Sequence, residues 1–168
     1  METEVWSYGK EAEAIISRYL KLRYTLMPYL YSLGKNTYDT GAPFMRALFM
    51  DFPHDPKVFA IGDQYMFGPE FLVAPVTEQG RESREVYLPS GSDWFNYWTN
   101  EKLAGGQTVT VAAPIDVIPL FVRAGSIVPL GVDISQHRDA SGAQGDSRLS
   151  GQECRVHVVR RQRCVVRL

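Results

Sequence analysis

Hydrophobic residues recur at helical spacing over the first forty residues of the chain. They follow one another in steps of three and four, which places them on one side of a helix: Ile15, Tyr19, Leu22, Leu26, Leu30 and Leu33. Proline removes an amide donor and clashes with the preceding turn, so Pro28 predicts a kink or break near Met27. A second short helix should then run to about Tyr38 and end before Gly41. The apolar side of these helices requires a partner surface.

From Ala42 the pattern changes to short β-rich runs, separated by turn-forming pairs such as Gly68-Pro69 and Ser90-Gly91. The predicted strands are Phe44–Phe52, Glu70–Val76, Arg84–Leu88, Trp94–Trp98, Gln107–Ala112, Val117–Val122 and Ser126–Leu130. Several short strands at this spacing predict an antiparallel β-sandwich or barrel. Proline cannot donate to a ladder, so we expect three of the prolines at strand ends, bulges or edges: Pro75, Pro119 and Pro129.

The composition is that of an ordinary globular protein. The 168 residues are 45% hydrophobic and 22% charged, with a formal net charge of -1. This excludes wholesale disorder, and it offers no global field for nucleic acid or for an anionic membrane. No apolar run approaches the length of about 20 residues that spans a membrane, and the first residues lack the layout of a signal peptide. The localisation of the protein therefore stays open.

The composition changes abruptly after Gly131. Residues 1–131 hold all 20 aromatic residues and all five lysines, and their 11 basic and 15 acidic side chains give a net charge of -4. Residues 132–168 contain seven arginines, no lysine, four acidic residues and both cysteines, Cys154 and Cys164. A segment without aromatic residues has little with which to bury a core. We therefore expect a disordered, arginine-rich tail over residues 132–168.

Motifs for metal or cofactor binding are absent from the sequence. The three histidines, His54, His137 and His157, are scattered, and the two cysteines form no CxxC pair. There is no GxGxxG, no Walker-type loop and no GxSxG nucleophile elbow. We expect no metal site and no cofactor.

The remaining candidate residues are carboxylates, arginines and tryptophans. Asp51 and Asp63 lie close together in the sequence, but structural carboxylates far outnumber catalytic ones. Arg46 and Arg123 stand in apolar runs, and we expect each to form a structural ion pair with Asp51 or Asp63.

Strand alternation sends Trp94 and Trp98 to one face, with Phe95 and Tyr97 on the other. Core packing is the favoured role for these aromatic residues. Trp94 and Trp98 also remain candidates for stacking on a sugar ring.

Five strings in order resemble the C-terminal part of glycoside hydrolase family 31, which includes α-xylosidases and α-glucosidases. They are RYLKLRYTLMPYLYSLG, GAPFMRALFMDFPHDP, IGDQYMFGPEFLVAPV, REVYLPSGSDWFNYWTNE and APIDVIPLFVRAGSIVPLG. The likeness covers about residues 1–131. Within the family, MRALFMDF, GDQYMFGP and SREVYLP are more similar to the α-xylosidase branch.

The resemblance implies a domain organisation. Residues 1–41 would be the end of the catalytic (β/α)8 barrel, with its last helix, and residues 42–131 the proximal C-terminal β-sandwich. The partner of the apolar stripe of Ile15, Tyr19, Leu22 and Leu26 would then be the rest of the barrel, which this chain lacks.

The resemblance also implies a chemistry. The family hydrolyses α-glycosidic bonds with retention, using an aspartate nucleophile and an aspartate acid/base about 5 Å apart. These lie in motifs like WxDMNE and RDIGGF, and neither occurs here. We therefore assign no catalytic residue and expect the chain alone to be inactive, as part of an α-glycosidase that acts on terminal α-xylosyl or α-glucosyl residues. The alternative is a carbohydrate-binding or structural β-sandwich module without catalysis.

The likeness ends at Gly131, where the arginine-rich tail begins. We hypothesise that residues from about Val132 are read from a shifted frame of a G+C-rich gene, and an uninterrupted frame through residue 168 would contradict this. The alternative is a genuine tail whose arginines contact anions.

Overall fold

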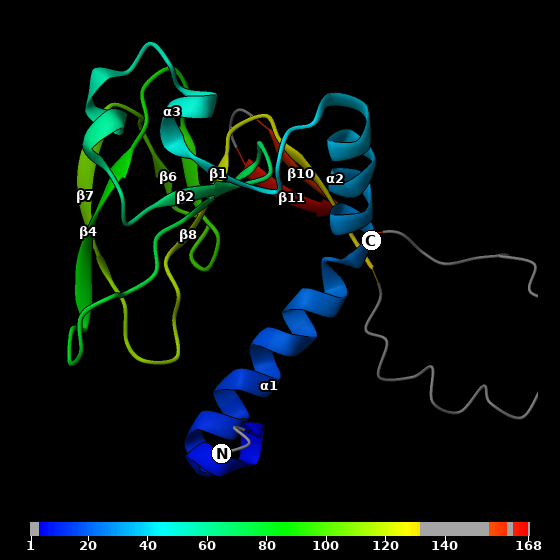
Figure 1. Ribbon diagram of the computed structural model, residues 1–168, viewed down its shortest axis with the longest axis vertical. Coiled ribbons are helices and arrows are strands. Elements are labelled where there is room, and N and C mark those ends of the chain that lie inside the picture. The colour runs from blue at the N-terminus through cyan, green and yellow to red at the C-terminus, as the bar shows by residue number, and fades with distance from the viewer. Residues whose placement is uncertain (1–3, 132–154, 161–162, 168) are drawn as a thin grey trace, which may run out of the picture.

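The computed structural model describes residues 4–131, 155–160 and 163–167. The chain begins with a short 3-10 helix, η1 (Val5–Tyr8), followed by α1 (Lys10–Thr25) and α2 (Met27–Thr40). Leu26 separates the two helices, and Pro28 lies in the first turn of α2, so the break predicted near Met27 is confirmed. Gly41 ends α2 with a φ of 76°, a left-handed conformation that glycine adopts without steric cost. In Figure 1, α1 extends away from the sheets while α2 lies beside them.

Antiparallel sheets dominate the rest of the described chain. The largest has six strands in the order β1-β2-β3-β8-β5-β6, and β4 pairs with β7 in a separate sheet. The strands are β1 (Met45–Ala47), β2 (Tyr65–Phe67), β3 (Phe71–Val73), β4 (Ser83–Leu88), β5 (Trp94–Asn96), β6 (Lys102–Leu103), β7 (Gln107–Ala112), β8 (Leu120–Arg123) and β9 (Ile127–Leu130). The mainly β fold class with leading helices is confirmed.

The prediction of a strand over Phe44–Phe52 is wrong beyond Ala47. The chain instead forms a helical turn, α3 (Leu48–Asp51). One helical turn brings Leu48 and Phe52 into the core together and leaves Phe49 and Met50 exposed, which strand alternation would not do. A second 3-10 helix, η2 (Pro56–Ala60), and the short strands β2 and β6 lie outside the predicted elements.

The six-stranded sheet is buried on both faces. Neighbouring residues along its strands point to opposite sides, as in the pairs Phe71-Leu72 and Phe121-Val122. On one face the core also draws on β4 and includes Leu48, Met66, Leu72, Val86, Leu88, Trp94 and Phe121. On the other face α2 and β9 supply partners, and the cluster is Tyr29, Leu33, Phe71, Phe95, Val122 and Val128. The sheet is thus the middle of three layers.

Part of the tail is ordered, which corrects the expectation of a disordered tail for two stretches. β10 (Arg155–Arg160) pairs antiparallel with β9 and with β11 (Arg163–Arg167), giving a sheet of order β11-β10-β9. Both stretches are rich in valine, a residue that favours strands. The rest of residues 132–168 lies outside the described residues, and the frame-shift hypothesis remains a prediction.

The three prolines occupy the kinds of position expected of them. Pro75 follows β3, Pro119 precedes β8, and Pro129 lies in β9, the edge strand of its sheet.

Candidate functional site

Helix α1 is fixed to the sandwich through the loop before β8. The backbone N–H of Ile118 donates to the Tyr19 hydroxyl at 2.8 Å, and that hydroxyl donates to the Asp116 carbonyl at 3.0 Å. Trp98 Nε1 donates to the Ile118 carbonyl at 2.8 Å. A single loop therefore receives hydrogen bonds from the helix and from the sandwich.

The aromatic ring of Trp98 is enclosed by neighbours from both sides of this contact. Tyr19 and Tyr97 meet it edge-on, with centroid distances of 6.2 and 5.0 Å. The Arg18 guanidinium lies 5.4 Å from the ring centroid and pairs with Asp116 at 3.2 Å. These contacts support a role for Trp98 as an anchor of α1, and its role as a sugar platform stays a prediction.

Trp94 and Trp98 do not share a face of one strand. β5 ends at Asn96, whose Oδ1 accepts from the Trp98 N–H at 2.9 Å and starts a turn, so alternation stops before Trp98. Trp94 is 0% exposed, its ring packs against Phe52 with centroids 5.8 Å apart, and its Nε1 donates to the Pro89 carbonyl. It offers no face to a sugar in this structure.

Helix α2 is fixed to the sandwich through Tyr29. The Tyr29 hydroxyl lies 2.9 Å from the carbonyl oxygen of Phe67, the last residue of β2, and 2.6 Å from Oε2 of Glu70, in the turn before β3. Gly68 sits beneath it with a φ of 65°. A Cβ on Gly68 would overlap the Tyr29 hydroxyl oxygen and lie 2.8 Å from Leu33 Cδ2. We call the contacts of α1 and α2 with the sandwich, made by Arg18, Tyr19 and Tyr29, the helix–sandwich joint.

The structure brings Arg46 and Asp51 together in a buried position behind this joint. Arg46 Nε lies 3.2 Å from Asp51 Oδ2, and the two side chains are 11% and 12% exposed. Burial raises the pKa of Asp51, although Arg46 and Arg123 act to lower it. Arg46 Nε and Nη2 and Asp51 Oδ2 have no well-aligned hydrogen-bond partner among the described residues. The pair is therefore held by charge attraction more than by directional bonds.

Asp63 and Arg123 are placed differently from the predicted pairing. Asp63 pairs with Arg84, whose Nη2 lies 2.6 Å from its Oδ2, and Arg84 also donates to the Pro75 carbonyl. Arg123 Nε donates to Ser92 Oγ at 2.8 Å, and its guanidinium lies 5.1 Å from the centroid of the Phe52 ring. The partners Arg84 and Ser92 were not found from the sequence, because both contacts join residues more than twenty positions apart.

Asp55 is a buried carboxylate with three donors. It accepts from the Tyr87 hydroxyl at 2.7 Å and from the N–H groups of Ser90 and Lys57 at 2.9 and 3.1 Å. Burial alone would raise its pKa, but these hydrogen bonds outweigh burial and lower the pKa to about 2. Burial and the neighbouring Asp55 raise the pKa of the Tyr87 hydroxyl to about 12. Asp55 therefore stays ionised and ties η2 to the end of β4.

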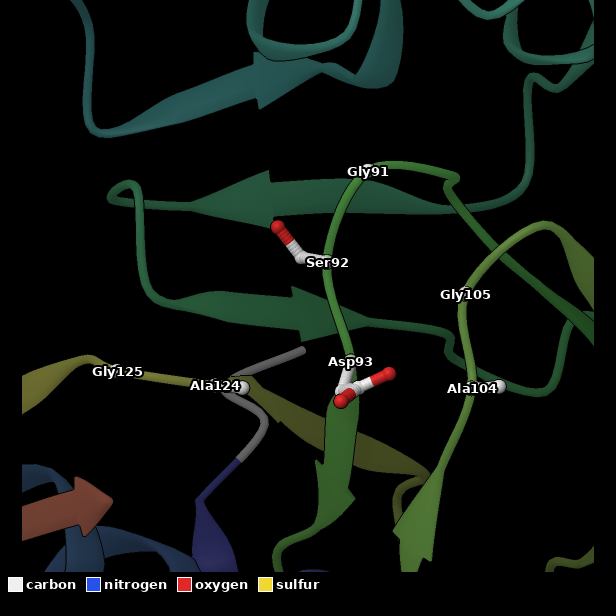
Figure 2. A pocket seen from close by; sticks show the side chains of 7 residues that line it. All are labelled: Gly91, Ser92, Asp93, Ala104, Gly105, Ala124 and Gly125. Carbon is white, nitrogen blue, oxygen red and sulfur yellow. The ribbon is translucent and has the colours of Figure 1, made fainter. Parts of the chain in front are cut away.

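A surface hollow of about 520 Å³ lies beside Arg123 and is shown in Figure 2. Its lining is Gly91, Ser92, Asp93, Ala104, Gly105, Ala124 and Gly125. The one carboxylate in this lining, Asp93, pairs with Lys102 at 2.9 Å. Hydrolysis of a glycosidic bond needs two facing carboxyls, so this hollow does not have the composition of a glycosidase site.

The opposite side of the two helices is apolar and uncovered. Its exposed residues follow helical spacing over α1 and α2 and are 41–84% exposed: Leu20, Tyr24, Met27 and Tyr31. We call these four residues the uncovered stripe. A hollow of about 490 Å³, lined in part by Met27, Leu30 and Tyr31, lies beside it.

The uncovered stripe corrects the expectation about which apolar residues face an absent partner. Tyr19, Leu26 and Leu33, from the stripe identified in the sequence, contact the sandwich instead. The helical pattern indicated an amphipathic helix, but it could not say which layer each side would meet.

Two further searches concern the described part of the chain. Within residues 4–131, 155–160 and 163–167, no three histidine, cysteine, aspartate or glutamate side chains gather into a group that could hold a metal ion. Among the described helices, none is long and apolar enough to cross a membrane.

Comparison with known families decides the identity. Residues 41–128 match the glycosyl hydrolase family 31 C-terminal domain. The chain belongs to glycosyl hydrolase family 31. Residues 1–33 match the TIM-barrel domain of the same family, so the resemblance stated from the five strings is confirmed.

Relatives within family 31 are enzymes of α-linked sugars. An α-xylosidase of Saccharolobus solfataricus is 47% identical over 127 residues, which are 76% of this chain and 17% of the relative. An α-glucosidase of Bacillus thermoamyloliquefaciens is 38% identical over 128 residues, 76% of this chain and 16% of the relative. The chain thus spans less than a fifth of the length of these relatives.

Solved structures of family 31 enzymes share the fold. A family 31 α-xylosidase from Xanthomonas citri superposes with a TM-score of 0.73 at 52% identity, over 76% of this chain and 14% of that one. A dextranase of Flavobacterium johnsoniae superposes with a TM-score of 0.82 at 36% identity, over 95% of this chain and 18% of that one.

Proposed function

We propose that this chain is the bracing end of a family 31 α-glycosidase. In this proposal α1 and α2 form the last helical layer of the catalytic barrel, and the sandwich holds that layer from outside. Residues 1–41 then belong to the barrel, 42–131 to the sandwich and 132–168 to the tail.

The observation that carries this proposal is that the helices are apolar on two opposite sides. One side packs on the six-stranded sheet through Tyr29 and Leu33. The other side carries the uncovered stripe. An apolar stripe on a helix normally faces a packing partner. The match of residues 1–33 to the barrel domain supports barrel strands as the second layer.

We propose further that the enzyme to which this chain corresponds hydrolyses terminal α-xylosyl or α-glucosyl residues, and that the α-xylosyl group is the better candidate. The identities of 47% and 52% with two α-xylosidases, against 38% with the α-glucosidase, support this order. In this proposal the barrel loops bind the carbohydrate substrate, so the chain itself holds no residue that selects it.

The chain alone should hydrolyse neither sugar. A retaining mechanism needs two free carboxyls about 5 Å apart. The aspartates of the described sandwich and joint are instead bound to other groups: Asp51 to Arg46, Asp55 to Tyr87, Asp63 to Arg84, Asp93 to Lys102 and Asp116 to Arg18. Each of these carboxylates already serves a contact within the fold.

Two experiments test the proposal. The purified chain is assayed on aryl α-xyloside and aryl α-glucoside, and turnover above a heat-killed control overturns the claim of inactivity. In the second, a family 31 α-xylosidase truncated before the matching helix is mixed with the chain. Restored turnover with the wild-type chain, and none with Tyr24→Asp/Tyr31→Asp, is the expected result. Equal restoration by the variant, or none by either chain, overturns the bracing role.

A matched control separates the stripe from general surface polarity. Phe59 is exposed on η2, on the other side of the six-stranded sheet from α2, so Phe59→Asp removes a comparable apolar side chain. This variant should restore turnover as the wild-type chain does.

A further inference from the structure

Strand β7 has an outer edge that no other strand covers. β4 pairs with one side of β7, and among the described residues no strand pairs with the other side. Figure 1 shows β4 and β7 on the side of the sandwich away from α2. The strand, Gln107–Ala112, contains no charged residue and no proline, and its pairing with β4 has no bulge. Natural edge strands normally carry one of these features, which discourage pairing with another chain.

The backbone of β7 turns its polar groups outward at every second residue. In an antiparallel pair, residues bonded to the partner strand alternate with residues whose N–H and C=O face away from it. Tyr87 of β4 faces away, because its N–H and its C=O both bond to the Gln64 side chain, at 2.9 Å each. Thr108 lies directly opposite Tyr87, so its N–H and C=O face away from β4 as well. The same alternation turns Thr110 and Ala112 outward, and among the described residues no hydrogen bond reaches the outward groups of these three.

These three outward residues are complementary to the same residues of a second copy. Residues directly opposite each other in a sheet share a face, so a two-fold axis between identical antiparallel strands passes through a residue position. An axis at Thr110 sets Thr110 opposite its own equivalent and Thr108 opposite Ala112. No other position of the axis pairs all three outward residues. Each such pair exchanges two hydrogen bonds, so the three pairs give six.

The side chains of β7 match in the same register. Val109 and Val111 are half-buried on the inner face of the strand, where they pack against the core. The axis at Thr110 sets Val109 opposite Val111 of the second copy, and on the exposed face it sets threonine opposite threonine. Pairs of threonines stabilise antiparallel sheets, and valine favours the pleated surface. No like charges meet across this contact, because β7 has none.

The opposite edge of the same sheet is already occupied. On β4 the Gln64 amide takes up the outward groups of Tyr87, and Gln64 is only 6% exposed. The Arg84 guanidinium donates to the outward carbonyl of Glu85 at 3.2 Å. A sheet with one open edge closes after two copies have met, whereas two open edges would allow a fibre. The contact at β7 is therefore that of a closed dimer.

We propose that the chain forms a two-fold dimer through β7, with a sheet of order β4-β7-β7-β4 running across both copies. The partner is a second copy of this chain, because the register that pairs every outward group is the one that two identical strands adopt about an axis at Thr110. This dimer does not draw on the proposed function, since α2 and β4 lie on opposite sides of the six-stranded sheet. The bracing role can fail while the dimer stands, and the reverse.

Sedimentation equilibrium over a series of concentrations tests the dimer. The parent chain for this experiment carries Tyr24→Asp/Tyr31→Asp, which removes association through the uncovered stripe. Its mass should rise with concentration from one chain to two and level off there. A mass that stays at one chain throughout the series, or that grows beyond two, overturns the proposal.

Two replacements at Thr110 block the edge and leave the bonds between β4 and β7 in place. Thr110→Pro removes an N–H that faces away from β4, and an edge strand tolerates proline at such a position. Thr110→Lys sets two like charges opposite each other across the axis. Both variants should stay monomeric with the circular dichroism spectrum of the parent chain, and Asn36→Lys, exposed on α2, should associate as the parent does. Thr110 variants that associate as strongly as the parent contradict a contact through β7.

Amide hydrogen exchange reads the register without a replacement at the edge. The amides of Thr108, Thr110 and Ala112 should exchange slowly in the dimer and rapidly in the monomer, because only the dimer bonds them. Those of Val109 and Val111, which bond to β4, should be protected in both states. If the three outward amides exchange equally fast at low and at high concentration, the proposal is overturned.

Discussion

Replacing Gly68 by alanine should weaken the helix–sandwich joint and lower the free energy of unfolding. The new Cβ would overlap the Tyr29 hydroxyl and lie 2.8 Å from Leu33 Cδ2. The left-handed backbone at Gly68 costs an alanine about 1–2 kcal/mol. Overpacking adds about 1–3 kcal/mol, and displacing the hydroxyl from its hydrogen bonds adds about 1 kcal/mol. The expected loss of unfolding free energy is therefore about 3–6 kcal/mol.

Equilibrium unfolding in urea measures this loss, with Gly80→Ala as the matched control. Gly80 also has a positive φ, of 77°, but a Cβ there would meet no atom within 4 Å. Its replacement should lower the free energy of unfolding by the backbone strain alone, about 1–2 kcal/mol.

A Tyr29→Phe background isolates the overlap with the hydroxyl. Without the oxygen, Gly68→Ala should cost about 1–2 kcal/mol less than in the wild type, because the coupled pair no longer collides. If Gly68→Ala costs no more than Gly80→Ala, or costs the same in both backgrounds, the close approach of α2 to the turn is not what requires glycine.

Three further predictions concern separate contacts. Asp55→Asn should lower the unfolding free energy at neutral pH by about 2 kcal/mol. The difference from wild type should vanish as the pH falls from about 4 to about 2, since the folded pKa is about 2; a pH series of urea melts measures it. Trp98→Ala should release α1 from the sandwich and speed its cleavage in limited proteolysis about five- to thirtyfold. Trp6→Ala, at an exposed position, should leave the cleavage rate unchanged. Equal cleavage rates for the two variants would contradict the anchoring role of Trp98. Asp51→Ala should lower the free energy of unfolding by about 3–5 kcal/mol, because it leaves the charge of Arg46 uncompensated. The double replacement Arg46→Met/Asp51→Leu should lower it far less. Equal losses in urea melts would contradict a role for the charge pair.

The local elements were largely predictable from the sequence because their signals are local. Pro28 located the break between the helices, and Gly41 located the end of α2. Alternation predicted β7 over its observed bounds, because that strand is long enough to repeat the pattern. It failed between Leu48 and Phe52, because a single helical turn also brings both of these side chains into the core.

The contacts of the helix–sandwich joint could not be predicted from local sequence patterns, because they join positions that are far apart in the chain. Tyr19 meets Ile118 across 99 residues, and Tyr29 meets Glu70 across 41. Helical spacing placed Tyr19 on the apolar side of a helix, but nothing in that spacing named the sandwich as its partner, and Tyr29 was not among the residues identified. The five strings of the family resemblance carried more information about function than any single candidate residue did.

The central sheet has a consequence for how the protein folds. Its strands cannot lose water from both faces until α2 has arrived on one side and β4 on the other. Helix and sandwich should therefore gain and lose structure in a single cooperative transition, although residues 1–33 and 41–128 match separate family domains. The border between those two family matches is therefore not a border between two folding units.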